Sequence, residues 1–242
     1  TAKQKSLFYQ RLCQVAMLQD RYQISAETLA LGRQSSLYAQ ETGHAWYITR
    51  SHFLVGFIQL WHGSFDEAED NLQQALSGAS KIGDIWSQNQ ILTYLTILYR
   101  FQGNVDQLTT YQSQFKEVSE AAGSPTYTAV WQANMAWLHY HNRQLQEAWE
   151  QAQAAVVTWG DAKNPFRWVA HWILLAVALE RGQIKETIRS AKVMLDPIQQ
   201  KLPEKVTASL EGAVENWELR KEETAKDYLE KGVKLAREMG YL

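Results

Sequence analysis

Of the 242 residues, 45% are hydrophobic and 21% are charged, and the formal net charge is −2. This composition excludes an intrinsically disordered chain, which lacks apolar residues and carries a high net charge. It also argues against direct nucleic-acid binding, which needs a clustered excess of Lys and Arg. The single cysteine, Cys13, cannot form an internal disulfide, and the four prolines are few enough to favour long helices.

A turn-like hexapeptide recurs about every forty residues. It begins at Gly63, Gly103, Arg143, Gly182 and Arg220. A repeat of this length is typical of stacked helical hairpins, which bury their apolar faces against one another. We therefore predict a single all-α domain over residues 1–242 with six units. Their ranges are 3–43, 44–83, 84–123, 124–164, 165–204 and 205–242. Glycines suited to a left-handed helix end stand at or near five unit ends: Gly43, Gly83, Gly123, Gly160 and Gly240.

Each unit is predicted to contain two helices. The segments before the turns are rich in large apolar residues, so we expect them to form A helices buried on two sides. They cover 46–61, 86–101, 127–140 and 166–179. The segments after the turns are B helices with one apolar face, on which small residues allow close packing: Ala68, Ala75, Ala148, Ala155 and Ala225. Asp66 and Asp84 are predicted helix caps, and Pro125 and Pro165 are expected near helix starts.

The second unit resembles a tetratricopeptide repeat. Its small and large residues fall at that motif's spacing: Gly56, Gly63, Phe65, Ala68, Leu72 and Ala75. The resemblance covers about residues 44–242 and implies a right-handed superhelical α-solenoid of about six repeats. At about forty residues, the units resemble the long repeats in C-terminal sensor arrays of bacterial multidomain signalling ATPases and transcription activators. We therefore expect the chain to be part of a longer protein.

The same resemblance implies a concave groove lined by the A helices. The positions expected to bind a ligand or partner there are Arg50, Phe53, Phe57, Arg100, Trp137, Tyr140 and Trp172. The arginines could hold a carboxylate or phosphate through paired contacts, and the aromatic rings could form a stacking platform. The alternative is that these tryptophans belong to the core between repeats, because aromatic residues at helical spacing more often serve packing.

No catalytic or metal-binding motif is visible in the sequence. Phosphate-binding glycine loops are missing, and His139 and His141 are two residues apart, which points them about 200° apart on a helix. Cys13 has no histidine nearby in the sequence, so we expect it to be a small buried residue. We therefore predict neither an enzyme nor a cofactor.

Two functions are consistent with these features. The first is a non-catalytic scaffold that binds a peptide, a partner protein or another domain of its own chain in the groove. The second is a small-molecule effector sensor in a bacterial signalling protein or transcriptional regulator. The chain shows no signal peptide and no apolar run of about 18 residues, so we expect a cytoplasmic protein without membrane contact.

Overall fold

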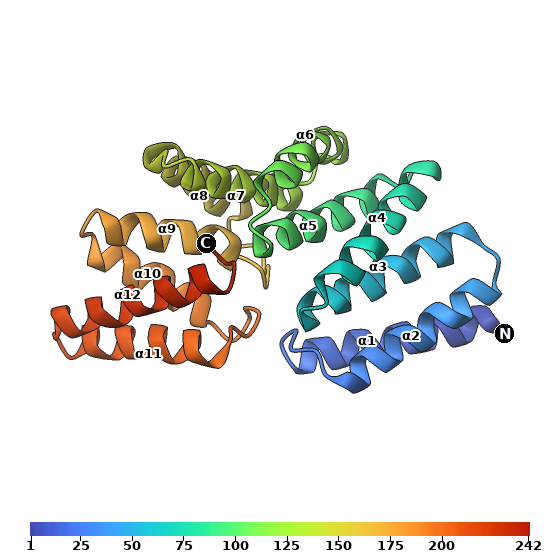
Figure 1. Ribbon diagram of the computed structural model, residues 1–242, viewed down its shortest axis with the longest axis horizontal. Coiled ribbons are helices and arrows are strands. Elements are labelled where there is room, and N and C mark those ends of the chain that lie inside the picture. The colour runs from blue at the N-terminus through green and yellow to red at the C-terminus, as the bar shows by residue number, and fades with distance from the viewer. The chain divides into compact units, whose positions relative to one another are not determined.

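The computed structural model describes residues 1–242 as twelve α-helices without a β-strand (Figure 1). The helices pack as consecutive pairs, which confirms the predicted all-helical architecture of hairpins. Those pairs are α1 (Ala2–Gln19) with α2 (Ala26–Glu41), α3 (Ala45–His62) with α4 (Phe65–Lys81), α7 (Pro125–His141) with α8 (Leu145–Trp159), α9 (Trp168–Glu180) with α10 (Ile184–Leu195), and α11 (Glu204–Glu218) with α12 (Glu222–Glu238). Between them, α5 (Ile85–Phe101) meets α6 (Val105–Ala122) where Asn89 Nδ2 donates to the Val118 carbonyl at 3.0 Å. None of the helices combines the length and hydropathy needed to cross a bilayer.

The predicted A helices correspond to α3, α5, α7 and α9. Their ends agree with the predicted ranges within two residues. The starts of α7 and α9 differ most, by two residues each. At α9, the residues from Pro165 to Arg167 form a turn, and the helix begins only at Trp168. In this turn the Gln200 backbone N–H donates to the Pro165 carbonyl at 2.8 Å, so the segment is held by the loop after α10.

The turns between paired helices share one backbone conformation. Gly63, between α3 and α4, has φ 89°, a left-handed value that glycine adopts without steric cost. Arg143 and Arg220 occupy the corresponding positions of later hairpins, and both have φ 59°. The turn geometry is therefore kept where the glycine is absent, at the expense of strain in a non-glycine residue. The first hairpin differs, since both Arg21 and Tyr22 are left-handed in its longer turn, which explains its poor match to the repeat pattern.

Of the predicted helix caps, the one at Asp84 is confirmed and the one at Asp66 is wrong. Asp84 is a cap, because its Oδ1 accepts the Ser87 backbone N–H at 3.0 Å, and Pro125 is the first residue of α7. Asp66 is not a cap: α4 begins at Phe65, so Asp66 lies inside the first turn, where a carboxylate still favours the positive helix end. The five predicted small residues of the B helices are all completely buried: Ala68, Ala75, Ala148, Ala155 and Ala225.

Gly56 shows why a small residue is needed where α3 crosses α4. A β-carbon placed there would lie 2.9 Å from Leu72 Cγ and 3.1 Å from the Ala68 carbonyl oxygen. The second atom belongs to the backbone of α4, so it can move only if the whole helix shifts. The glycine therefore sets how closely the two helices approach.

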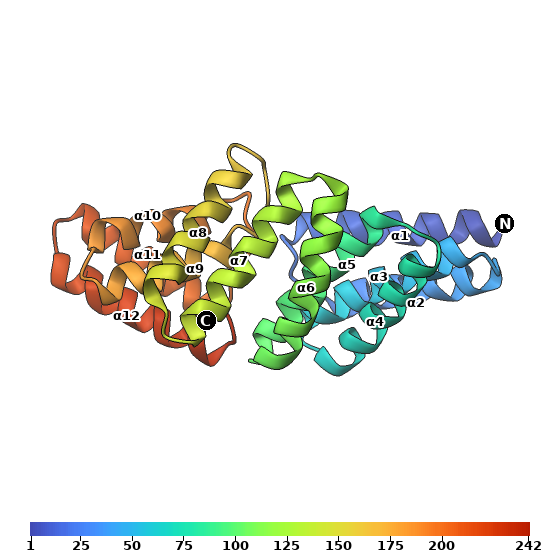
Figure 2. The same ribbon diagram turned by 90° about the horizontal axis from the view of Figure 1, so that it is seen from above.

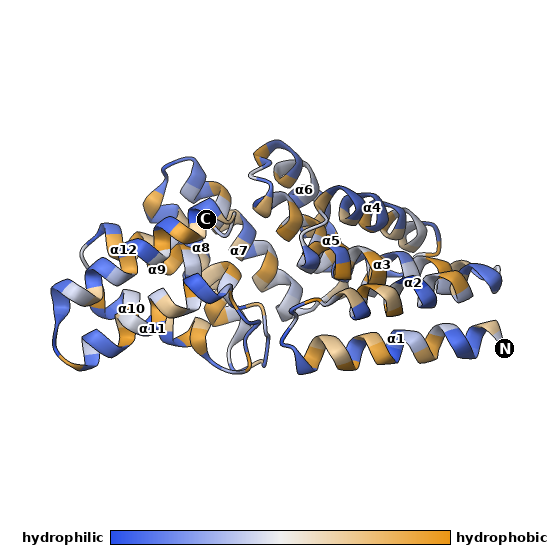
Figure 3. Ribbon diagram, turned by 60° about the horizontal axis from the view of Figure 1, so that its bottom comes forward, coloured by the Kyte–Doolittle hydropathy of each residue, from blue (hydrophilic) through white to orange (hydrophobic).

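The chain divides into two compact units. Unit 1 comprises residues 1–99 and 114–123, and unit 2 comprises residues 100–113 and 124–242. In unit 1, hydrophobic and hydrophilic stretches alternate along α1, as expected for a helix with one buried face (Figure 3). In unit 2, α9 packs against α7, α8, α10 and α12, and every residue from Trp168 to Ala178 is buried. Figure 2 shows the helices of Figure 1 from above.

Candidate functional site

Unit 1 contains an open pocket of about 250 Å³ that we call the aromatic groove. The first helices of three consecutive hairpins, together with one turn, line it. Its residues are Gln14, Met17 and Leu18 of α1, Tyr22 of the first turn, Phe53, Leu54 and Phe57 of α3, and Gln90 and Tyr94 of α5. Phe53 and Phe57, like Gln90 and Tyr94, are four residues apart, so each pair lies on one face of its helix. Helical periodicity thus brings side chains from three hairpins to one surface.

The rings of the aromatic groove are in mutual contact. Phe57 and Tyr94 have centroids 4.5 Å apart with their planes at 85°, and Phe53 lies 5.9 Å from Tyr94. Tyr22 meets the edge of Phe57 at 6.0 Å. These separations are the edge-to-face and tilted arrangements that aromatic pairs prefer. Phe57 is largely buried beneath the others, whereas Phe53, Tyr22 and Tyr94 keep part of their surface exposed.

The aromatic groove is lined by no charged side chain. Its polar groups are two amides, Gln14 and Gln90, and two phenol hydroxyls. Burial raises the pKa of Tyr22, so this phenol stays protonated and can donate a hydrogen bond. An uncharged surface of aromatic rings with a few amides suits apolar side chains flanked by a peptide backbone, and it offers nothing to neutralise an anion.

Two of the predicted binding residues, Phe53 and Phe57, line this groove, but Arg50 does not. The Arg50 guanidinium lies 5.8 Å from the Trp46 ring, and its Nε and Nη2 donate to the Gln10 amide oxygen at 2.8 and 3.2 Å in the amide orientation that satisfies both groups. Burial, aided by Arg11, lowers its pKa. Arg50 therefore connects α3 to α1.

The remaining predicted residues lie in unit 2, around Arg100 at the end of α5. Its guanidinium is almost fully buried, and no carboxylate pairs with it. Nη2 donates to the Val169 carbonyl at 2.9 Å and to the Tyr241 carbonyl at 3.4 Å, and Nη1 lies 3.5 Å from Asn134 Oδ1. Burial lowers the pKa of Arg100 to about 9. Because a charged group in such a place is costly, its hydrogen bonds to carbonyl groups are essential.

Aromatic rings surround the buried guanidinium. The Arg100 guanidinium carbon lies 5.9 Å from the ring centroids of both Trp137 and Trp168, a cation–π distance. Trp137 and Trp172 have no exposed surface. Neither tryptophan therefore offers an open ring face as a platform. Their complete burial fits the alternative given in the sequence analysis, in which these tryptophans belong to the core between repeats.

The segment that follows α12 occupies this aromatic cluster. The Tyr241 ring lies 5.1 Å from Phe101, 5.0 Å from Trp168 and 6.0 Å from Trp172, measured between centroids. Tyr241 and Leu242 are both buried. We call the cluster formed by Arg100, Phe101, Trp137, Trp168 and Trp172 the Arg100 site. The chain's own Tyr241 fills it.

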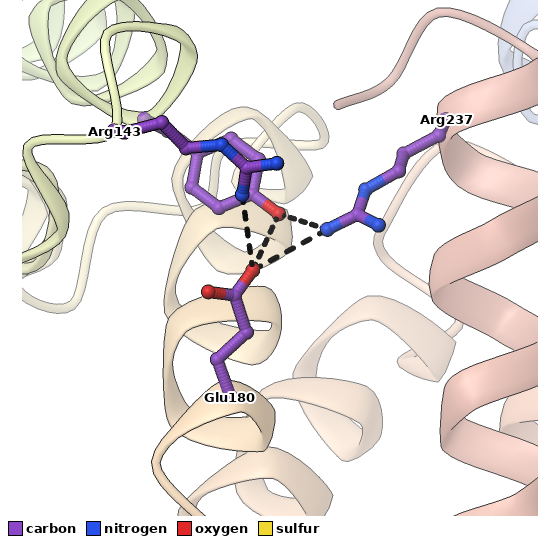
Figure 4. A network of polar contacts seen from close by, with 4 residues as sticks. Arg143, Glu180 and Arg237 are labelled. Carbon is purple, nitrogen blue, oxygen red and sulfur yellow. Dashed lines mark hydrogen bonds and ion pairs between the residues drawn. The ribbon is translucent and has the colours of Figure 1, made fainter.

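Tyr140, the last predicted residue, belongs to a polar network nearby in the same unit. Its hydroxyl donates to Glu180 at 3.2 Å and accepts from Arg237 at 2.5 Å. Arg237 and Arg143 also lie 3.4 and 4.0 Å from Glu180, so this carboxylate stands between two guanidinium groups (Figure 4). Cavities of about 300 and 440 Å³ open beside this network, and Arg143 and Arg237 line both.

The histidine, cysteine and acidic side chains form neither a cluster for a metal ion nor an exposed thiol. No group of three or more His, Cys, Asp or Glu side chains could hold a metal ion. Cys13 is buried and donates to the Thr28 carbonyl at 3.3 Å, and burial raises its thiol pKa to about 12, which suppresses the nucleophilic thiolate.

Sequence reasoning missed several residues of both sites. The α1 contribution to the aromatic groove was missed because the first hairpin lacks the turn hexapeptide of the later ones. Gln90 and Tyr94 of α5 were also not among the predicted binding residues, although Tyr94 lies about one repeat length after Phe53. Tyr241 could not be found from periodicity, because it lies beyond the last helix and 141 residues from Arg100. The only sequence signal for Arg237 as a site residue was its position in the last turn of an amphipathic helix.

No model of a known protein family matches this sequence, and no curated protein matches it. A proposal about function therefore depends on the residues of the chain itself.

Proposed function

We propose that this protein is a tetratricopeptide-like interaction module that binds a peptide segment of a partner protein in the aromatic groove of unit 1. In support, the consecutive hairpins turn through left-handed residues, and Gly56 meets Ala68 and Leu72 where the motif places small residues. The six-repeat count and the right-handed superhelix expected from the sequence belong to this proposal, as do a cytoplasmic location and a role in bacterial signalling.

One observation carries the proposal. The helices α1, α3 and α5 together present partly exposed rings and amides, and no charge, to one pocket of about 250 Å³. A pocket of this size holds one or two apolar side chains of an extended peptide. Gln14 and Gln90 can bond the peptide's main chain, whereas Phe53 and Tyr94 bury its side chains.

Selection of peptides from a random displayed library against the whole chain tests the proposal. We expect the selected peptides to share an aromatic or aliphatic anchor and to lose at least about tenfold in affinity on Phe53→Ala. Phe8→Ala is the matched control, because Phe8 is an exposed ring of α1 that does not line the groove. Selected peptides that bind Phe53→Ala as tightly as the unaltered chain would refute binding in this groove.

A second candidate function is recognition of a small anionic effector in unit 2. The observation that favours it is the pair of arginines, Arg143 and Arg237, which line both cavities beside Tyr140 and Glu180 (Figure 4). A carboxylate or phosphate could displace Glu180 from between them. Calorimetric titration with inorganic phosphate tests this, and heat that persists unchanged in Arg143→Gln and Arg237→Gln would exclude the site.

A further inference from the structure

We propose that the Arg100 site of unit 2 is a second peptide-binding site, for which Gly240–Leu242 is the chain's own displaceable ligand. The peptide it takes has a glycine, an aromatic residue and an aliphatic residue in succession. The proposal is independent of the aromatic groove, because no residue is shared between the two.

The contacts of Gly240–Leu242 are those of a bound peptide. An aromatic side chain inserts among Phe101, Trp168 and Trp172, and its main-chain carbonyl accepts a hydrogen bond from the buried Arg100. This is the combination of an aromatic anchor and a main-chain contact that gives a peptide both affinity and direction. The anchor lies just beyond the end of α12.

Gly240 adds a requirement on the sequence of the ligand. A β-carbon at this position would lie 2.5 Å from the Phe101 carbonyl oxygen and 2.8 Å from the Phe101 Cα. Both atoms are backbone, so only a residue without a side chain allows the segment to approach. With φ 78°, Gly240 also adopts a conformation that other residues resist. The site therefore selects glycine immediately before the aromatic anchor.

The Arg100 site has donors that the segment does not use. Arg100 Nε, Trp137 Nε1 and Trp172 Nε1 are buried N–H groups without an acceptor. A fully matched permanent core would satisfy such groups, because an unpaired buried donor is unfavourable. The segment itself is held to α12 by few main-chain bonds, from Tyr241 N to Ala236 O at 2.9 Å and from Gly240 N to Arg237 O at 3.2 Å. A peptide with further acceptors can thus compete with it.

The test uses the full chain and a fluorescent peptide with the sequence Glu-Met-Gly-Tyr-Leu, amidated at its end. The double variant Tyr241→Ala, Leu242→Ala frees the site, so we expect it to bind the peptide about tenfold more tightly than the unaltered chain, in which the internal segment competes. A peptide with alanine in place of tyrosine is the matched control and is expected not to bind. Equal affinity of both proteins, or of both peptides, would overturn the proposal.

A second measurement on the unaltered chain covers the case in which the double variant does not fold. Hydrogen exchange at the Tyr241 amide, which is bonded to Ala236, is followed with and without excess peptide. Displacement predicts faster exchange at Tyr241 and unchanged exchange within α1, and the alanine peptide should have no effect. Exchange at Tyr241 that stays constant as the peptide concentration rises would show that the segment is fixed core.

Discussion

The two units use aromatic residues of their A helices in opposite ways. In unit 1, Phe53 and Tyr94 keep exposed surface and line an uncharged open groove. In unit 2, Trp137 and Trp172 are completely enclosed, and the Tyr241 ring lies against Trp172. The repeat pattern assigns Phe53, Trp137 and Trp172 to the same face of their hairpins, so the pattern alone does not decide whether an aromatic residue binds or packs.

One contributor to this difference is the stretch after α12. Its Tyr241 ring packs against Phe101, Trp168 and Trp172, and its carbonyl group reaches Arg100 across 141 residues of sequence. Substitutions in each unit test this contrast between exposed and enclosed rings.

The largest effect is expected from truncating a fully enclosed ring. Trp137→Ala should lower the free energy of unfolding by about 3–5 kcal/mol, because it removes a large buried side chain and leaves a cavity. Phe53→Ala in unit 1, where the ring is partly exposed, should cost clearly less. Urea unfolding followed by circular dichroism measures both. A loss below about 1 kcal/mol for Trp137→Ala would mean that its ring is available to a ligand, and the contrast between units would fail.

The next largest effect on the free energy of unfolding is expected from His171, a buried histidine of unit 2. Burial, with a smaller contribution from Arg167, lowers the pKa of His171 from 6.5 to about 4, and neither ring nitrogen has a hydrogen-bond partner. The unfolded chain therefore binds a proton between pH 6.5 and 4 that the folded chain does not, so stability falls with decreasing pH across that window. The loss attributable to His171 approaches about 3 kcal/mol at the acid end.

Unfolding measured from pH 7 to pH 4 in His171→Leu checks this expectation. The variant should lose part of the acid sensitivity, whereas His62→Gln, which alters an exposed histidine of unit 1, should keep it. An unchanged pH profile in His171→Leu would show that the imidazole is reached by water.

The smallest effect concerns helix packing within hairpins of the two units. Gly56→Ala should destabilise by about 1–3 kcal/mol, because the new methyl group meets the backbone of α4. Gly232→Ala in α12 is the matched control, since its β-carbon would meet only side-chain atoms, the nearest being Leu210 Cδ2 at 3.3 Å. There, the helical preference of alanine should make the change neutral or slightly stabilising. Equal effects at the two positions would contradict the proposed role of Gly56.

Sequence periodicity predicts the helices and their turns well, because local forces determine both. Apolar spacing places α3, α5 and α7 within two residues, and Arg143 and Arg220 mark turns even though they replace glycine. The cap assigned to Asp66 was wrong because α4 starts at Phe65 with Ser64 as its N-cap, so Asp66 is the second residue of the helix.

The candidate sites are less predictable because they depend on contacts between distant residues. Phe53 and Phe57 were found by analogy with an A-helix face, and they do line a pocket. The partners of Arg100 could not be predicted from the sequence. Val169 and Tyr241 contribute backbone carbonyl groups, which every residue possesses, so no side-chain pattern reveals them. The same applies to Tyr140, whose partner Arg237 is 97 residues away.

The path of the backbone has a practical consequence for dissecting this molecule. It leaves unit 1 after Tyr99, returns at Gln114 and leaves again after Gly123. No single cleavage point can release both halves whole: a fragment ending at Gly123 would carry away Arg100, and one ending at Tyr99 would forfeit Gln114–Gly123. Either half expressed alone should therefore fold poorly or aggregate. Sites that tolerate insertion of a tag are better sought in the exposed turns at Gly63 or Gly182.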